Sequence, residues 1–437
     1  MLNNHNLDVL LVFGLPLILF AVVYFLWQGR VKKKATRKLN QAIQDKLVEP
    51  ASLHPSIDPS VCLGCGTCVS ACPEGEILGL IDRKAVLVSP TSCIGHGACH
   101  DACPTDAITL VFGTESRGVE IPFLNADFET TVPGIYIAGE LGGMGLIKNA
   151  IAQGKQAIDA ISKTSKNRPA AELDLVIVGA GPAGLSAALA AKQKKLNFIV
   201  LEQDSIGGTI SHYPRGKIVM TQPAQLPIVG KFQFREASKE TLVNFWNDAV
   251  SHIEKAIKTG QQVTNIEEHD NGFSVSTTDN SYQCASVLLA MGRRGTPRKL
   301  DVPGEEMDKV VYRLIDPEQY KGQHILVVGG GDSAIEAALA LAQQKGTTTT
   351  LSYRSPAFSR AKSKNRERLQ EAEKNGNIQV LLESNVKEIR KDSVAINSKD
   401  ETLELPNNAV LVCAGGILPT PFLKRIGINV EEKFGVA

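Results

Sequence analysis

The fold is decided by residues 173–184, LDLVIVGAGPAG, which lead into an alanine-rich helix. A second apolar run, residues 198–201, ends at Glu202. The two runs predict buried parallel strands, and the glycines of the turn are Gly179, Gly181 and Gly184. Such glycines permit a tight turn and let the backbone approach a pyrophosphate, while the acid accepts hydrogen bonds from a ribose. Together these features predict a dinucleotide-binding unit rather than a merely structural glycine turn.

A second unit of the same kind begins with residues 324–328, HILVV. The following strand, residues 348–353, ends at Arg354 instead of an acid, and Arg360 follows. A cation in this place suits a 2′-phosphate, which favours NADP(H) over NAD(H). The alternative is that these cations form a solvated face. The positions of the turn that would contact the nucleotide are Gly329, Gly331 and Ala334.

The N-terminal third contains two cysteine runs, at residues 62–73 and 93–104, and each run ends in Cys-Pro. Three thiolates on one loop and a fourth a helical turn later suit an iron–sulfur cube. Zinc is the rival, but its sites usually combine two separated Cys-x2-Cys pairs. The candidate ligands are Cys62, Cys65, Cys68, Cys72, Cys93, His96, Cys99 and Cys103.

His96 stands where the first run has a cysteine. A neutral imidazole in place of a thiolate would make a cluster less negative and raise its reduction potential. The alternatives left open are that His96 is no ligand, and that the second site holds a three-iron cluster or none.

Length, net charge and the placement of the cysteines limit the classes of function that the chain can have. The 437 residues suffice for about two to four domains, and the net charge of +1 argues against a nucleic-acid binder. Seven of the nine cysteines lie between residues 62 and 103, so cluster binding in a reducing compartment is favoured over disulfides. The other two, Cys284 and Cys413, occur in apolar strand-like stretches and are expected in the core.

Residues 9–27 form an uncharged run of 19 residues, about the length of one membrane-spanning helix. Basic residues follow the run, which predicts a single-pass anchor (1–29) in the inner, cytoplasmic membrane with the N-terminus outside. A cleaved signal peptide fits less well, because its charges would precede the run. Residues 30–56 are expected to form a basic stalk that is either a solvated spacer or touches anionic lipid. The basic residues are Arg30, Lys32, Lys33, Lys34, Arg37 and Lys38.

Residues 57–112 resemble the bacterial two-cluster ferredoxins, with two Cys-Pro-terminated runs separated by a short strand-like stretch. In that family the fourth cysteine of each run serves the other cluster. The resemblance therefore implies one cluster on Cys62, Cys65, Cys68 and Cys103. It implies a second on Cys72, Cys93 and Cys99, with position 96 in question.

Residues 172–437 resemble the thioredoxin-reductase-like flavoproteins through GAGPAG, Gly207-Gly208, the crossover LLAMGRRGTPRKL and GGGDSAIE. The resemblance implies an α/β fold with two Rossmann-like domains. FAD would bind the first domain (172–294, completed by 415–437), and NADP(H) the second (295–414). It also implies hinges near residues 291–295 and 415–419, and makes a homodimer a possibility.

That family closes its FAD domain with T-x-PGI(Y/F)-x-x-GD and a helix, but this chain ends without such a segment. The motif is found instead at residues 129–160, with Glu140 after Gly139 where the family has aspartate. In the family, the acid holds the ribityl chain of the flavin. We therefore expect a circular permutation in which residues 113–165 complete the FAD domain. The hypothesis requires the PGIYIAG strand to lie beside the GAGPAG turn.

The function expected from these parts is a membrane-anchored NAD(P)H-dependent iron–sulfur flavoprotein oxidoreductase. It would pass electrons between NADP(H), FAD and the clusters, to or from an unknown redox protein or quinone-linked partner. Thioredoxin reductases carry a Cys-x-x-Cys pair shortly before the second glycine turn, but residues 310–324 contain no cysteine. The pattern resembles the ferredoxin–NADP reductases of the same superfamily. A disulfide reductase and a membrane-linked redox sensor are the alternatives.

Overall fold

The computed structural model describes residues 14–45, 47–50, 53–143, 145–164, 171–213, 215, 217–220, 223–233, 236–293, 295–358, 361–398 and 401–435. The chain divides into two units. The first comprises Met1–Arg117 with Phe434–Ala437, and the second comprises Gly118–Lys433. The cysteine runs belong to the first unit, and both glycine turns belong to the second.

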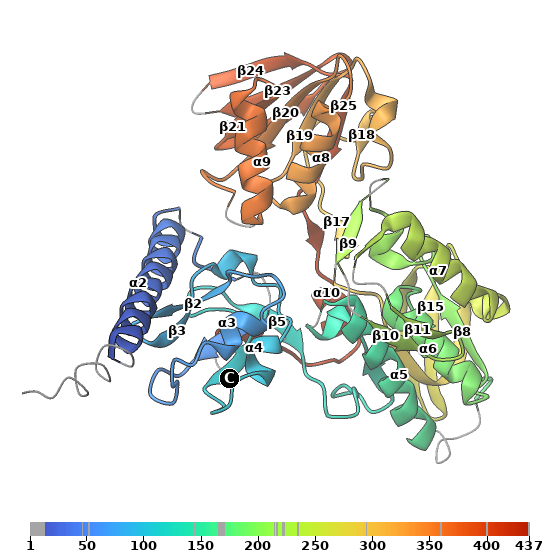
Figure 1. Ribbon diagram of the computed structural model, residues 1–437. Coiled ribbons are helices and arrows are strands. Elements are labelled where there is room, and N and C mark those ends of the chain that lie inside the picture. Colours follow the sequence, from blue (N-terminus) through green and yellow to red (C-terminus); the bar gives the residue numbers. More distant parts are fainter. Residues whose placement is uncertain are drawn as a thin grey trace, which may run out of the picture. The chain divides into compact units, whose positions relative to one another are not determined.

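In the described part of the first unit, a long helix accompanies small pairs of strands (Figure 1). Helix α2 (Leu15–Gln44) runs without a break through residue 30, where the sequence suggested that an anchor gives way to a stalk. Residues 1–13, which include the start of the apolar run, lie outside the described residues. The strand pairs are β1 (His54–Ile57) with β4 (Ile108–Val111), and β2 (Leu78–Ile81) with β3 (Lys84–Leu87). The short helices are α3 (Thr67–Ala71), η2 (Pro90–Ser92) and α4 (Ala98–Asp101).

Helix α2 has two different halves. Its N-terminal half exposes large apolar side chains, such as Phe20 at 71% and Phe25 at 70%. Among the described residues, α2 alone is long and apolar enough to cross a membrane, and a signal sequence would share that length and composition. In its C-terminal half Ala35 and Ala42 are buried, and Ala35 packs so tightly on β2 that a Cβ at Gly79 would lie 2.7 Å from it.

The FAD-type sheet of the second unit has the strand order β13-β8-β7-β16-β15-β14. Strands β7 (Leu173–Val178), β8 (Phe198–Leu201), β13 (Ile257–Lys258) and β16 (Ser281–Leu289) are parallel, and β14 (Val263–His269) and β15 (Gly272–Thr277) are antiparallel. Helices α5 (Ile147–Thr164), α6 (Pro182–Gln193) and α7 (Lys239–Ser251) share one buried core with this sheet. The smaller elements are β5 (Val119–Pro122), η3 (Glu140–Gly142), η5 (Gly208–Ile210), β9 (Ile218–Met220), β10 (Ala224–Leu226), β11 (Gly230–Phe232), β12 (Glu236–Ser238), η6 (Glu254–Ala256), α10 (Thr420–Arg425) and β27 (Val430–Lys433).

Strand β6 (Ile135–Ile137) joins the same sheet, where it pairs parallel with β16. Strand β7 flanks β16 on the other side and leads directly into the GAGPAG turn. The three residues of β6 are at most 1% exposed, so this segment belongs to the core of the domain. The structural condition on the PGIYIAG strand is therefore met, while the permuted order itself stays a prediction.

The second Rossmann-like domain has a five-stranded parallel sheet in the order β18-β25-β19-β20-β21. Helices α8 (Asp332–Ala342) and α9 (Ser363–Lys374) pack against it (Figure 1). The strands are β18 (Val310–Val311), β25 (Ala409–Val412), β19 (His324–Val328), β20 (Thr348–Tyr353) and β21 (Ile378–Leu382). An antiparallel sheet of β22 (Ser384–Ile389), β23 (Ser393–Ser398) and β24 (Glu401–Pro406) adjoins them, and η7 (Pro317–Tyr320) precedes β19.

The predicted α/β class with two Rossmann-like folds is confirmed. The two segments expected to act as hinges lie next to each other, because β17 (Thr296–Pro297) pairs antiparallel with β26 (Gly416–Ile417). Cys284 is 1% exposed in the core, and Cys413 is half-buried against the core around α8.

Candidate cofactor sites

The two cysteine loops of the first unit have the same backbone form. Gly64 and Gly66 have φ values of +72° and +80°, and they flank Cys65. Gly95 and Gly97 have φ values of +77° and +78° and flank His96 in the same way. Only glycine adopts this left-handed conformation readily, so the pattern Cys-x-Gly-(Cys/His)-Gly produces equivalent loops. His96 therefore occupies the place in its loop that Cys65 occupies in the first.

One group of thiols gathers around the first loop. Burial raises the pKa of the Cys68 thiol, and the charges of Cys62 and Cys65 add to the increase. The pKa of Cys65 is lowered, chiefly by the Thr67 hydroxyl, which lies 3.0 Å from its sulfur. The pKa of Cys103 is also lowered, chiefly by a hydrogen bond from the backbone N–H of Thr105, although the nearby charge of Cys65 acts in the opposite direction. Cys103 thus lies with the cysteines of the other run.

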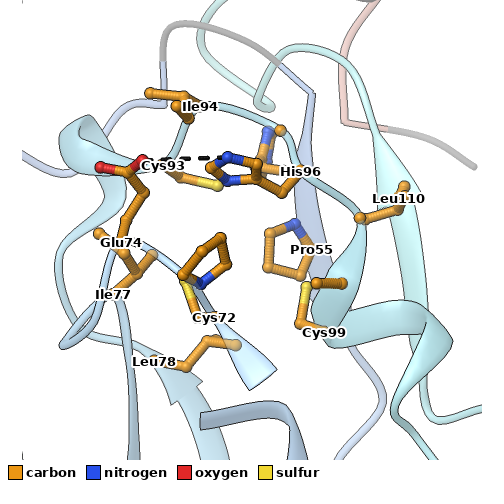
Figure 2. A pocket seen from close by; sticks show the side chains of 15 residues that line it. Pro55, Cys72, Glu74, Ile77, Leu78, Cys93, Ile94, His96, Cys99 and Leu110 are labelled. Atoms are coloured by element: carbon orange, nitrogen blue, oxygen red, sulfur yellow. Dashed lines mark ion pairs between the residues drawn. The ribbon is translucent and has the colours of Figure 1, made fainter. Parts of the chain in front are cut away.

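The second group contains Cys72, Cys93, His96 and Cys99, which line one small pocket together with Glu74 (Figure 2). Burial is the main cause that raises the pKa of Cys93, and the charges of Cys72 and Glu74 raise it further. The pKa of Cys99 is likewise raised by burial and by its two neighbouring thiols. The imidazole Nε2 of His96 lies 3.9 Å from a carboxylate oxygen of Glu74, and its side chain is 15% exposed.

Cys72 thus lies with the second loop, and the hydroxyl of Thr105, two residues after Cys103, donates to the carbonyl oxygen of Val61 beside the first loop. In the described parts of the chain, no three His, Cys, Asp or Glu side chains are close enough to hold a single metal ion. A cube carries its irons at separate corners, so its ligands stand farther apart than those of one ion. The donor set of four thiols in the first group fits a 4Fe-4S cluster.

The turn after β7 fits a pyrophosphate. Gly179 has φ +105°, and a Cβ there would lie 2.7 Å from the carbonyl oxygen of Ala290. A Cβ on Gly184 would lie 1.8 Å from the carbonyl oxygen of Gly179, so helix α6 can begin this close to the strand only with glycine. A Cβ built on Gly181 would have only the Cα of Gly208 within 4 Å, at a distance of 3.8 Å. The backbone there is open to a ligand.

Glu202 braces this turn. Its carboxylate accepts hydrogen bonds from the N–H of Ala180 at 2.7 Å and from the N–H of Asp204 at 2.9 Å. Gly207 donates its N–H to the carbonyl oxygen of Ala180, which places the Gly207-Gly208 pair against the turn. A carboxylate offers about four acceptor sites, so Glu202 retains capacity for a ribose.

Segment 118–164 supplies another side of the same site. Gly139 has φ +85°, and its N–H donates to the side chain of Gln153 at 2.8 Å. Helix α5 crosses α6 so closely that a Cβ on Gly154 would lie 2.1 Å from the carbonyl oxygen of Ala183. A cavity of about 690 Å³ results, and its lining includes Gly139, Glu140, Gly179, Gly181, Glu202 and Gly208.

An ion cluster that sequence reasoning missed lies on the wall of this cavity. Arg313 bonds the carboxylate of Asp204 at 2.6 Å, and His212 Nε2 lies 3.4 Å from the same oxygen. The hydrogen bond from Arg313 lowers the pKa of Asp204. The partners are 109 residues apart in the chain, so no local spacing could have pointed to the pair.

The second glycine turn is tightly packed at Gly329 and open at Gly331. A Cβ on Gly329 would lie 2.3 Å from the carbonyl oxygen of Cys413, while the space around Gly331 is open. Ala334 is fully buried where α8 meets the sheet. Arg354 is exposed just after β20, and Arg360 lies outside the described residues.

Comparison with known proteins agrees with both parts of the chain. The model of the pyridine nucleotide-disulphide oxidoreductase family matches residues 176–436, and that of the 4Fe-4S dicluster domain matches residues 54–104. A ferredoxin–NADP reductase of Ignicoccus hospitalis is 30% identical over 60% of this chain and 83% of its own length. The bacilliredoxin reductase Bdr of Bacillus subtilis is 25% identical over 60% of this chain and 82% of its own.

Among solved structures, the bacillithiol disulfide reductase Bdr from Bacillus cereus has a TM-score of 0.53 at 24% identity, over 59% of this chain and 82% of that one, and shares the fold. The matches identify a flavin-dependent NAD(P)H oxidoreductase that carries a 4Fe-4S domain. Because the first family match spans more than half of the residues, the chain belongs to the pyridine nucleotide-disulphide oxidoreductase family.

Proposed function

We propose that the chain is a membrane-anchored, NADP(H)-dependent iron–sulfur flavoprotein that exchanges electrons with a separate redox partner. The observation that carries this proposal is that a 4Fe-4S dicluster domain and a pyridine nucleotide oxidoreductase domain occur in one polypeptide. Ferredoxin–NADP reductases among the relatives support it. Bound flavin would supply the needed chemistry, because flavins can accept hydride from nicotinamide and release electrons singly.

The residues of the chain would place the nucleotides. The open backbone at Gly181 and the N-terminus of α6 suit the pyrophosphate of FAD, and Glu202 suits its ribose. Glu140 projects from the η3 turn into the same cavity and would hold the ribityl chain. Arg354 would pair with the 2′-phosphate of NADP(H), because it replaces the acid that would repel that group.

In the first unit we assign one cluster to Cys62, Cys65, Cys68 and Cys103. We assign a second to Cys72, Cys93 and Cys99, with His96 as its fourth ligand. The matched backbone of the two loops supports His96, since the imidazole starts from the same place as the Cys65 thiol. Its position on the wall of the small pocket that Cys72, Cys93 and Cys99 also line agrees with this (Figure 2).

The circular permutation is part of this proposal. Segment 118–164 lies outside the family match at residues 176–436, yet it belongs to the same structural unit. The Ignicoccus relative is covered over 83% of its length, which leaves room for a segment of this size. The pairing of β6 with β16 and the close approach of Gly154 to Ala183 support the view that this segment closes the FAD domain.

Anchoring in the inner membrane through α2, with the redox parts in the cytoplasm, completes the proposal. The exposed apolar half of the helix supports it. The packing of Ala35 on β2 would then hold the cluster sites near the bilayer, so we place the redox partner at the membrane.

A disulfide reductase is the second candidate, suggested by the Bdr relatives. Against direct thiol chemistry, no cysteine occurs among the described residues that line the 690 Å³ cavity.

Anaerobic titration with NADPH tests the function, followed by absorbance for the flavin and electron paramagnetic resonance for the clusters. We expect the flavin to bleach first and a reduced cluster signal to follow. The variant Cys65→Ser should lose the signal of the first cluster but keep flavin reduction, and Cys284→Ser serves as a control away from the ligands. Clusters that stay oxidised while the flavin is fully reduced would refute the proposed electron transfer. Rapid NADPH-driven disulfide reduction would favour the second candidate.

A further inference from the structure

The cations after the apolar run divide into those that form ion pairs within the first unit and those that do not. Lys34 and Lys38 both form ion pairs with Glu76, which directly precedes the β2–β3 hairpin. The hydrogen bonds from these two lysines lower the pKa of Glu76. Lys32 pairs with Asp82 in the turn of the hairpin. These three charges are thus used inside the first unit.

The remaining cations, Arg30, Lys33 and Arg37, are all exposed. Their spacings of three and four residues place them along one helical face. At about 100° per residue they lie roughly 120–180° around the helix from Ala35 and Ala42. No acidic side chain of the described residues forms an ion pair with any of the three. We refer to Arg30, Lys33 and Arg37 as the outer basic stripe.

The stripe begins where the apolar run ends. Trp27, at 60% exposure, is the last aromatic residue of the run and suits the boundary between acyl chains and headgroups. With a rise of about 1.5 Å per residue, Arg30 lies roughly 4.5 Å beyond it, Lys33 roughly 9 Å and Arg37 roughly 15 Å. The headgroup layer of one leaflet is about 5–8 Å thick, so the first two cations reach it or its surface.

We propose that the outer basic stripe binds the headgroups of anionic phospholipids and thereby orients the cluster unit on the bilayer. This inference rests on the proposed membrane anchor and goes beyond it, since it names the lipid class and the residues. A lipid surface is favoured because the stripe continues directly from exposed apolar residues on the same helix. Arg30 and Lys33 should contribute most, because attraction to the surface falls off within a Debye length of about 8–10 Å.

The test uses the full chain, purified in a neutral detergent and titrated with phosphatidylglycerol or phosphatidylcholine under native mass spectrometry. Phosphatidylglycerol should bind more tightly than phosphatidylcholine. Each cation near the surface contributes about fivefold to affinity, so Arg30→Gln with Lys33→Gln should weaken phosphatidylglycerol binding roughly 25-fold. The matched control is Lys32→Gln with Lys38→Gln, which removes the same charge from the side of α2 that pairs with Asp82 and Glu76 and should change this affinity little.

Equal affinity for the two lipids, or an equal loss in both double variants, would overturn the proposal. Failure of the anchor itself is read separately, by washing membranes that contain the full chain with alkaline carbonate. Release by that wash would refute the anchor, whereas a chain that stays in the membrane and shows no lipid preference would refute only the role of the stripe.

Discussion

Replacing Gly154 by alanine tests whether segment 118–164 completes the FAD domain. Gly154 lies in the middle of α5, and a Cβ there would lie 2.1 Å from the carbonyl oxygen of Ala183 and 3.2 Å from the backbone nitrogen of Ala187. Both atoms belong to the backbone of α6, so neither can rotate away. The two helices would have to separate, and α6 carries the glycine turn at its N-terminus.

Two effects of the substitution oppose each other, so its sign is informative. In an isolated helix, alanine is more favourable than glycine by about 1 kcal/mol. Overpacking a tight contact costs about 1–3 kcal/mol, and a contact with backbone falls at the upper end of that range. The free energy of unfolding should therefore fall by about 2 kcal/mol, which corresponds to a decrease in Tm of about 4–6 °C for a domain of this size.

The assay is thermal unfolding of the flavin-loaded protein, followed by the fluorescence of released flavin. Gln156→Ala is the matched control, because Gln156 is exposed on the same helix and should change stability by less than about 0.5 kcal/mol. If Gly154→Ala raised Tm, as helix propensity alone demands, α5 could not lie against α6 and the permuted assembly of the domain would be wrong.

Three further variants test the sites. His96→Cys should lower the potential of the second cluster and change its paramagnetic spectrum, because a thiolate replaces a neutral ligand; an unchanged spectrum and potential would count against ligation. Arg354→Ala should raise the KM for NADPH about tenfold and leave the KM for NADH unchanged in a dye-reduction assay, because it removes a charge-assisted hydrogen bond to the 2′-phosphate. Asp204→Asn should flatten the acid dependence of stability. Arg313 lowers the pKa of Asp204, so its stabilisation is present above the ordinary aspartate range and is lost as pH falls through and below that range. Urea unfolding at pH 7 and pH 3.5 measures the difference, which should stay below about 1 kcal/mol because the side chain is 44% exposed.

The glycine turns could be predicted because the motifs that contain them are short. Gly184 is needed for the carbonyl oxygen of Gly179, only five positions away, so the reason for it is visible within one short motif. The equivalence of the cluster loops is local in the same sense, since Gly64 and Gly66 recur as Gly95 and Gly97. The backbone conformation of such motifs can therefore be inferred from a few neighbouring residues.

Contacts between distant segments could not be predicted in the same way. The pair of Asp204 and Arg313 depends on how two domains come together, and neither residue lies in a motif. The basic stalk is a second example. From its charged composition alone, the stalk would be expected to be exposed to solvent all round. In the structure, however, Ala35 and Ala42 are buried and Lys38 forms an ion pair with Glu76, so one face of the helix packs against the unit. Which of the cations are neutralised becomes visible only when α2 is packed on its hairpin.

The two proposed cluster sites differ in ways that would partly offset each other. The first has four thiolates, and it lies near exposed Leu63, which is 71% accessible. Exposure to water raises the potential of a cluster, and His96 as the proposed neutral ligand would do the same in the more enclosed second site. The carboxylate of Glu74, 3.9 Å from that imidazole, returns a negative charge to the second site and opposes the effect of the histidine. In the proposed two-cluster arrangement, the histidine would therefore raise the potential of the second cluster and its acidic neighbour would lower it, so replacing Glu74 by glutamine should shift that potential upward.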